Sequence, residues 1–178
     1  FVVLLIEVQF LLPIYVNNHL HAGADVYASS EVYFALGSLA AGLLIRKLTS
    51  HFAPAKTIVW LMILAGVSFI VVAFTDSVIG FYLFSILIGW SNAGTRITRI
   101  TFLFNHVPNN IIGRANSIFY VYNIASRGIL ITVFAMAYFS ELNNIIWTYV
   151  ICGCFILVSA LPLVVFANRL SNIKVNSL

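Results

Sequence analysis

The chain has 178 residues, of which 62% are hydrophobic and only 8% are charged, and its formal net charge is +4. Soluble domains carry about 25% charged residues, so the composition excludes an ordinary soluble domain and indicates an integral membrane protein. Nucleic-acid binding has no support either, because the basic residues flank the apolar segments and thereby account for the net charge.

Apolar runs separated by short polar breaks predict six membrane-spanning helices. A helix needs about 20 apolar residues to cross the hydrocarbon, and these runs are too long for the strands of a membrane barrel. The predicted spans are residues 1–16, 31–48, 57–75, 78–104, 115–139 and 145–167, followed by a tail at 168–178. Since the first run is shorter than a full span, we expect an N-terminal part of a longer protein to precede Phe1.

Basic residues gather in alternate breaks between the spans. They are Arg46, Lys47 and Lys56 in the second break, Arg114 at the end of the fourth, and Arg169 and Lys174 in the tail. The remaining breaks contain no lysine or arginine and carry Asp25, Asp76 and Glu141. Because basic loops stay on the cytoplasmic side, we expect both termini in the cytoplasm, in a bacterial inner membrane.

Two opposite charges are predicted near the middle of the membrane. Arg127 lies 13 residues beyond Arg114, or roughly 20 Å along a helix. Glu7 lies ten residues before Asn17, or about 15 Å. Ionisable groups at such depth usually mark a substrate or proton path. A structural ion pair that only locks the first and fifth helices together is the alternative.

Polar side chains follow one face of the fourth and of the fifth predicted span, at steps of three and four residues. These two rows are Ser85, Gly89, Asn92, Arg96 and Arg99, and Asn116, Tyr120, Asn123 and Arg127. Both rows are expected to face a polar interior. The alternatives are hydrogen bonds that join helices and, for the two arginines of the fourth span, anchoring at the cytoplasmic surface.

The candidate substrate- or proton-binding residues are therefore Glu7, Asn92, Arg96, Tyr120, Asn123 and Arg127. The third and sixth spans differ, because no charged side chain occurs between residues 58 and 74 or between 145 and 167. These two helices are expected to lie against lipid. Cys152 and Cys154 fall in the sixth span, where packing is expected rather than a disulfide or a metal site.

Two local motifs add to this topology. GSLAAGLLIRKLTSHFAPAK, residues 37–56, is similar to the Gly-rich helix end and short basic loop of the major facilitator superfamily, although the acid usual in the family's N-terminal copy is absent. VPNNIIGRANSIF, residues 107–119, resembles a passage found in the drug and siderophore exporters of that superfamily, in which Pro108 would end the fourth helix. The residues that these motifs assign to the cytoplasmic loops or to gating are Gly42, Arg46, Lys47, Gly113 and Arg114.

The whole arrangement resembles the C-terminal half of a major facilitator superfamily transporter. The resemblance implies an all-α membrane protein whose six helices form two inverted three-helix repeats, with the third helix of each repeat at the periphery. It also implies a missing N-terminal six-helix half and a small-molecule substrate.

The resulting expectation is a secondary active transporter that works by alternating access, with efflux and coupling to an ion such as the proton. No cofactor or metal is expected. An intramembrane enzyme is disfavoured, because all four histidines lie in or beside loops and no H-E-x-x-H motif occurs. A channel, or a permease subunit that depends on an energising partner, remains the alternative; the chain itself has no G-x-x-x-x-G-K phosphate-binding loop.

Overall fold

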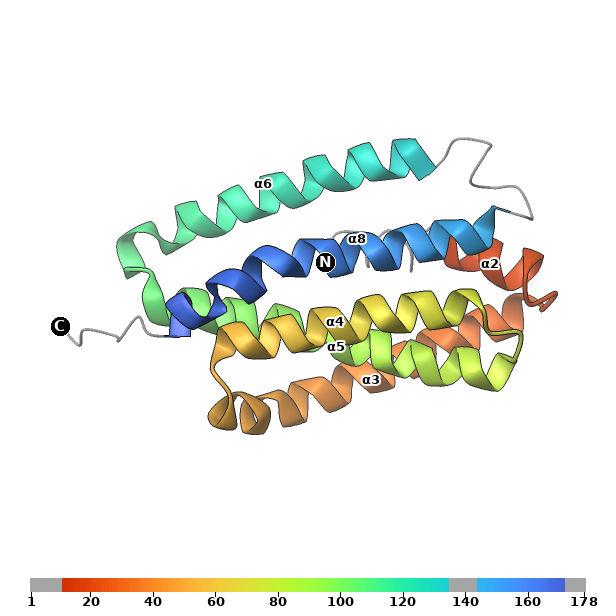
Figure 1. Ribbon diagram of the computed structural model, residues 1–178, viewed down its shortest axis with the longest axis horizontal. Helices are drawn as coiled ribbons and strands as arrows, with labels where there is room; N and C mark the ends of the chain where they lie inside the picture. The colour runs from red at the N-terminus through yellow and green to blue at the C-terminus, as the bar shows by residue number, and fades with distance from the viewer. Residues whose placement is uncertain (1–10, 135–143, 172–178) are drawn as a thin grey trace.

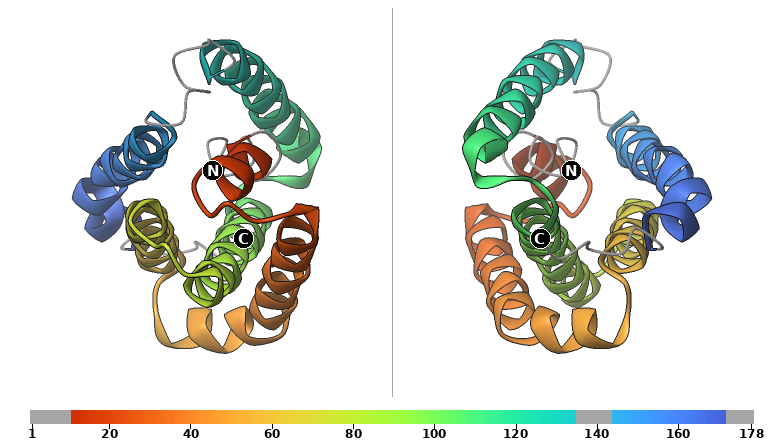
Figure 2. Two further views of the ribbon diagram at one scale, coloured as in Figure 1. Left: turned by 90° about the vertical axis from the view of Figure 1, so that its right-hand side faces the viewer. Right: turned by 90° about the vertical axis from the view of Figure 1, so that its left-hand side faces the viewer.

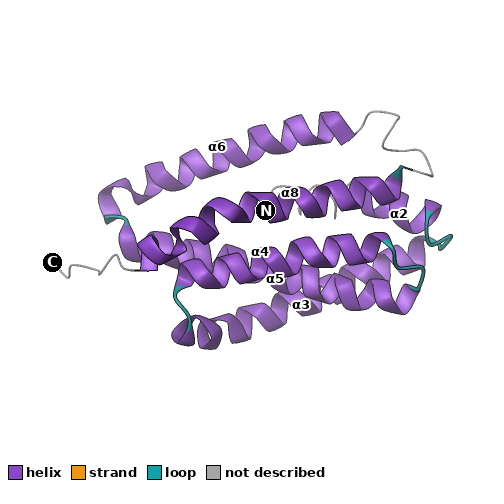
Figure 3. Cartoon of the chain, in the orientation of Figure 1, coloured by secondary structure: helices purple, strands orange, loops and turns teal. Residues whose placement is uncertain are grey.

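The computed structural model describes residues 11–134 and 144–171, and the regular structure in these ranges is helical (Figures 1 and 3). The helices are α2 (Leu12–Asn18), α3 (Ala24–His51), α4 (Pro54–Ala73), α5 (Val78–His106), α6 (Asn109–Phe134) and α8 (Ile145–Ser171). All of these except α2 are long and apolar enough to cross a membrane. The expectation of an all-α integral membrane protein is confirmed. Glu7 and most of the first predicted span lie outside the described residues.

Two helices begin earlier than the spans predicted for them. α3 starts at Ala24 and α6 at Asn109, seven and six residues before the expected starts at 31 and 115. The preceding polar residues continue the helices instead of forming loops. Asp25 lies in the first turn of α3, where the helix dipole favours a carboxylate. The carbonyl of Pro108 accepts hydrogen bonds from the amides of Ile111 and Ile112 at the start of α6, at 3.1 and 3.2 Å.

The connections between α3 and α4 and between α5 and α6 lie at one end of the bundle, which we call the basic end because Arg46, Lys47, Lys56 and Arg114 are near it (Figure 1). The opposite end, which carries Asp25 and Asp76, is the acidic end. α5 stops at His106 because Val107 is extended, with φ −108° and ψ 128°. This is the conformation that a following proline imposes on the residue before it.

Four long helices follow one another around the bundle in the order α3, α5, α4 and α8, and each packs along the next (Figure 2). α3 and α5 run in the same direction and are held together by two glycines. A Cβ atom at Gly37 would collide with the carbonyl oxygen of Ile86, and one at Gly89 would collide with the carbonyl oxygen of Phe34. Each glycine therefore lets the backbone of the other helix approach closely, as small residues do between membrane helices. The Ser38 hydroxyl adds a hydrogen bond to the Gly89 carbonyl, at 3.1 Å.

α4 and α8 pack through a second reciprocal pair of glycines. A Cβ atom at Gly66 would lie 3.0 Å from the carbonyl oxygen of Gly153, and one at Gly153 would lie 2.8 Å from the carbonyl oxygen of Gly66. The surfaces of α4 and α8 that face away from this contact are exposed and apolar. They include Trp60, Val67 and Val71 on α4, and Trp147, Ile151, Val158, Leu161 and Val165 on α8. Exposed apolar side chains are what lipid-facing helices require.

The short helix α2 lies inside the bundle (Figure 2). Its Tyr15 is fully buried, and the hydroxyl reaches the carbonyl oxygens of Val72 and Thr75 at the end of α4, at 2.7 and 3.0 Å. The Tyr15 ring also packs against Phe81 and Tyr149. α2 thus joins α4, α5 and α8 near the acidic end.

α6 is the exception to this close packing. It stands apart from the other helices over most of its length, opposite α5 (Figures 1 and 2). Only 6% of an apolar 18-residue stretch of this helix is buried. Two of the cavities described below are lined by both α5 and α6.

Candidate functional site: a basic cavity between helices

A cavity with a volume of about 670 Å³ lies between α3, α5 and α6. α3 contributes Phe34 and Ser38. The lining residues from α5 and α6 are Asn92, Ala93, Arg96, Ile97, Arg99, Ile100, Asn116, Phe119, Tyr120 and Asn123. We call this the central cavity. Apart from Ser38 of α3, its polar groups come from the two rows identified in the sequence.

Four of the six candidate binding residues meet in the central cavity, namely Asn92, Arg96, Tyr120 and Asn123. Arg127 is half-buried and lies one turn beyond Asn123 on α6, but it is not among the residues that line this cavity. Glu7 falls outside the described residues, so its proposed pairing with Arg127 stays a prediction.

A second cavity, of about 440 Å³, adjoins the first between α5, α6 and α8. Arg96, Arg99, Phe119 and Asn123 line both cavities. The guanidinium carbon of Arg99 lies 5.6 Å from the centre of the Phe119 ring, which is within the range of a cation–π interaction. Both arginines of α5 thus face the space between the helices, which favours cavity lining over a purely anchoring role.

The charge of the central cavity has one sign. Among the residues that line it are two arginines and no aspartate or glutamate. The remaining polar groups are three asparagines, one serine and one tyrosine, which can donate or accept hydrogen bonds. Such a wall suits a ligand with an anionic group, because a guanidinium binds carboxylates and phosphates through paired N–H donors.

The residues assigned to gating are distributed between two places at the basic end. Gly42 and Arg46 line a separate cavity of about 460 Å³ between α3, the start of α4 and α5. Lys47, Gly113 and Arg114 are exposed and line neither this cavity nor the central one. Nothing in the described residues joins these five residues into one site.

The sequence interpretation overlooked three side chains that the structure places at these cavities. Phe34 and Phe119 contribute aromatic walls, and no residue pattern distinguishes such walls from ordinary lipid-facing aromatics. Glu31 lines a small cavity near the acidic end. A signal for Glu31 did exist, because it is an acid at the first position of the predicted span 31–48, but it was not considered as a binding residue.

Comparison with known proteins gives one match. The family model described as Major Facilitator Superfamily matches residues 7–177. Searches among curated proteins and among solved structures gave no match. The family match covers nearly the whole chain and agrees with the apolar helices of the structure. The chain belongs to the Major Facilitator Superfamily of membrane transporters.

Proposed function

We propose that the central cavity binds a small molecule that carries an anionic group, and that the protein transports this molecule by secondary active transport. The observation that carries the proposal is the convergence of Arg96 and Arg99 with the side-chain amides of Asn92 and Asn123 on one cavity between membrane-spanning helices. Charged groups inside a membrane are costly and usually serve a substrate or ion path.

Alternating access follows as the proposed mechanism because the cavity is bounded by helices that differ in how firmly they are packed. α3 and α5 are joined through Gly37 and Gly89, whereas α6 is largely separate. A second six-helix half, with the six helices of this chain arranged as two inverted repeats, would complete the walls. Rocking of the two halves would then open the cavity to each side in turn.

The finer features of the proposal come from the sequence. The alternation of basic and acidic breaks supports termini in the cytoplasm of a bacterial inner membrane. The passage at residues 107–119 favours efflux, and the intramembrane charges favour coupling to an ion such as the proton.

A binding experiment tests the anionic substrate. The purified full-length protein is heated with a panel of matched compounds, each offered as a carboxylate or phosphate and as its neutral ester or amide. We expect at least one anionic member to raise the melting temperature, since a ligand that binds only the folded state stabilises it. Arg96→Gln should abolish that rise.

Lys56→Gln is the matched control, because Lys56 is an exposed cation at the basic end that lines neither cavity at α5 and α6. It should leave the rise in place. Stabilisation by neutral members alone, or equal loss in both variants, would refute an anion site at Arg96. A stabilising anion is then tested for counterflow in vesicles that contain the purified protein.

A further inference from the structure

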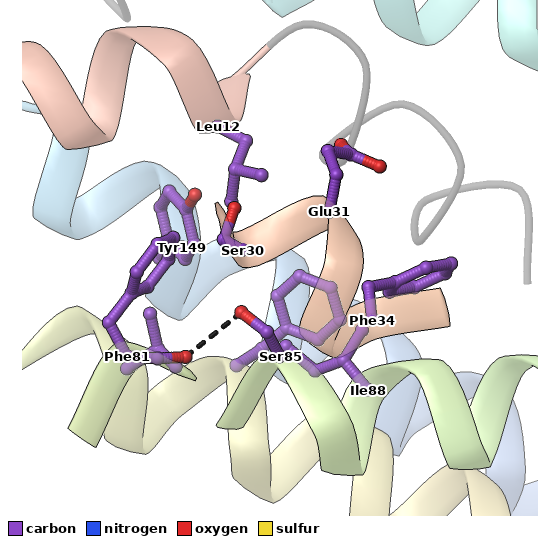
Figure 4. A pocket seen from close by; sticks show the side chains of 10 residues that line it. Leu12, Ser30, Glu31, Phe34, Phe81, Ser85, Ile88 and Tyr149 are labelled. Atoms are coloured by element: carbon purple, nitrogen blue, oxygen red, sulfur yellow. Dashed lines mark hydrogen bonds between the residues drawn. The ribbon is translucent and has the colours of Figure 1, made fainter. Parts of the chain in front are cut away.

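Glu31 lies well inside a membrane-spanning helix. It is seven residues from the start of α3 at Ala24, which places it roughly 10 Å along the helix from the acidic end. Together with Ser30 on α3 and Ser85 on α5 it lines a small cavity (Figure 4). The other lining residues are Leu12, Phe34, Phe69, Val72, Phe81, Ile88 and Tyr149. The carboxylate is therefore set in surroundings that are mostly apolar.

No cation neutralises this carboxylate among residues 11–134 and 144–171. The ion pair found in these ranges joins His19 to Asp76, at 3.3 Å, near the acidic end. The polar side chain that acts on Glu31 is Tyr27, one turn back on the same helix. A single hydroxyl does not balance a charge.

The helices around the cavity bring no lysine or arginine to it either. The titratable groups that they place on this side of the bundle are Tyr15 and the capping His19 of α2, Tyr82 on α5, and Tyr149 and Cys152 on α8, and His19 is paired with Asp76. The nearest cation on α5 is Arg96, 11 residues beyond Ser85 and so roughly 16 Å further along the helix.

A metal ion does not fit this site. Calcium and magnesium take about six or more oxygen ligands, whereas the cavity offers one carboxylate and the hydroxyl-bearing side chains of Ser30, Ser85 and Tyr149. Both serine hydroxyls already donate hydrogen bonds, from Ser30 to the Tyr27 carbonyl at 2.7 Å and from Ser85 to the Phe81 carbonyl at 2.9 Å. The cavity volume of about 20 Å³ leaves room for about one water molecule. A proton is the cation that such a site can hold.

Phe34 connects this site to the central cavity. It lines both and lies on the same face of α3 as Glu31 and Ser38, at steps of three and four residues. On α5, Ile88 faces the small cavity and Asn92 the central one. The two cavities therefore meet at Phe34, at the level where Gly89 of α5 meets α3.

We propose that Glu31 is the proton-binding carboxylate of this transporter and that Phe34 transmits its state to the central cavity. The proton adds to a carboxylate oxygen, and no other bond changes. Neutral Glu31 allows Phe34 to close the passage beside Ile88, whereas ionised Glu31 draws water into the small cavity and shifts Phe34. This inference rests on the proposed transport function and names the residue that couples it to a proton.

Carbodiimide labelling tests proton binding without any substrate. Dicyclohexylcarbodiimide is apolar and adds to protonated carboxyl groups, and peptide mass spectrometry locates the adduct. In the unaltered full-length protein we expect Glu31 to be modified several-fold more than Asp25 and Asp76, and its modification to fall as the pH is raised. Modification of Glu31 no greater than that of Asp25 would overturn the proposal.

Cysteine accessibility tests the link to the central cavity. Ala93 lines that cavity, so Ala93→Cys in a Cys152→Ser, Cys154→Ser background reports access of a membrane-impermeant maleimide. Glu31→Gln gives the pH dependence of the thiol alone. With Glu31 present, we expect the alkylation rate to change with pH more than it does in the Glu31→Gln variant. Phe34→Ala should remove this extra change. Asp25→Asn, at the acidic end of α3, is the control and should retain it.

The two tests separate the failures of the two proposals. Identical pH profiles with and without Glu31 would overturn the coupling role, even if the anion-binding experiment at Arg96 succeeded. Conversely, absence of any Arg96-dependent stabilisation would refute the anion site. The carbodiimide labelling would still test proton binding by Glu31, because it uses no substrate.

Discussion

The contact between α3 and α5 gives the sharpest prediction about stability. A Cβ atom at Gly89 would collide with the carbonyl oxygen of Phe34 and would lie 2.9 Å from its carbonyl carbon and 3.1 Å from its Cα atom. These are backbone atoms, which cannot rotate away as the end of a side chain can. Gly89→Ala therefore forces the two helices apart at the wall of the central cavity.

The size of the effect follows from these distances. Carbon atoms pack at about 3.5 Å or more, so α3 and α5 must separate by roughly half an ångström or more. Overpacking of this kind costs about 1–3 kcal/mol, and alanine returns about 0.5–1 kcal/mol through its better helix propensity. We expect the free energy of unfolding to fall by a net of about 1–2 kcal/mol, which lowers the melting temperature by about 2–8 °C.

Thermal unfolding of the purified protein in detergent measures this difference. Gly128→Ala on α6 is the matched control, because a Cβ atom there would meet nothing within 4 Å, and alanine should leave the melting temperature unchanged or raise it slightly. If Gly89→Ala melted at or above the temperature of the Gly128→Ala variant, the close approach of α3 and α5 would be refuted.

Two further predictions concern single contacts. Tyr15→Phe removes the hydroxyl that holds α2 to the end of α4. Thermal unfolding should show that the free energy of unfolding falls by about 1 kcal/mol. Tyr33→Phe is the control, because it keeps the stacking of the ring on Tyr82, and it should have a smaller effect. A double-mutant cycle of Arg99→Gln and Phe119→Leu should give a coupling energy of about 0.5–2 kcal/mol from the cation–π contact, and a coupling indistinguishable from zero would exclude that contact.

Much of the topology could be predicted from local sequence. Each apolar run that falls within the described residues corresponds to a helix, and Pro108 separates α5 from α6. The helix starts were less predictable, because polar residues such as Asp25 can belong either to a loop or to a first helical turn beyond the hydrocarbon. Because the second span was predicted to start at residue 31, Glu31 was expected at the end of this helix, whereas it lies seven residues from the start of α3.

The candidate site was only partly predictable for a different reason. Helical periodicity shows that Asn92, Arg96 and Arg99 share a face, but it does not show which helix lies opposite that face. The structure places α6 there and brings Tyr120 and Asn123 to the same cavity. Arg127 belongs to the same row of α6, yet it lies beyond the residues that line the cavity.

The sequence by itself determined that this chain crosses a membrane, where its helices lie and which ends carry the basic residues. These properties depend on how each segment partitions between water and lipid, and that preference is local to the segment. Only the tertiary structure decided which glycines touch, which helices enclose the central cavity and what surrounds Glu31. Those features depend on the rotation of each helix about its axis and on its distance from the next, both of which are set by the side chains of two helices together.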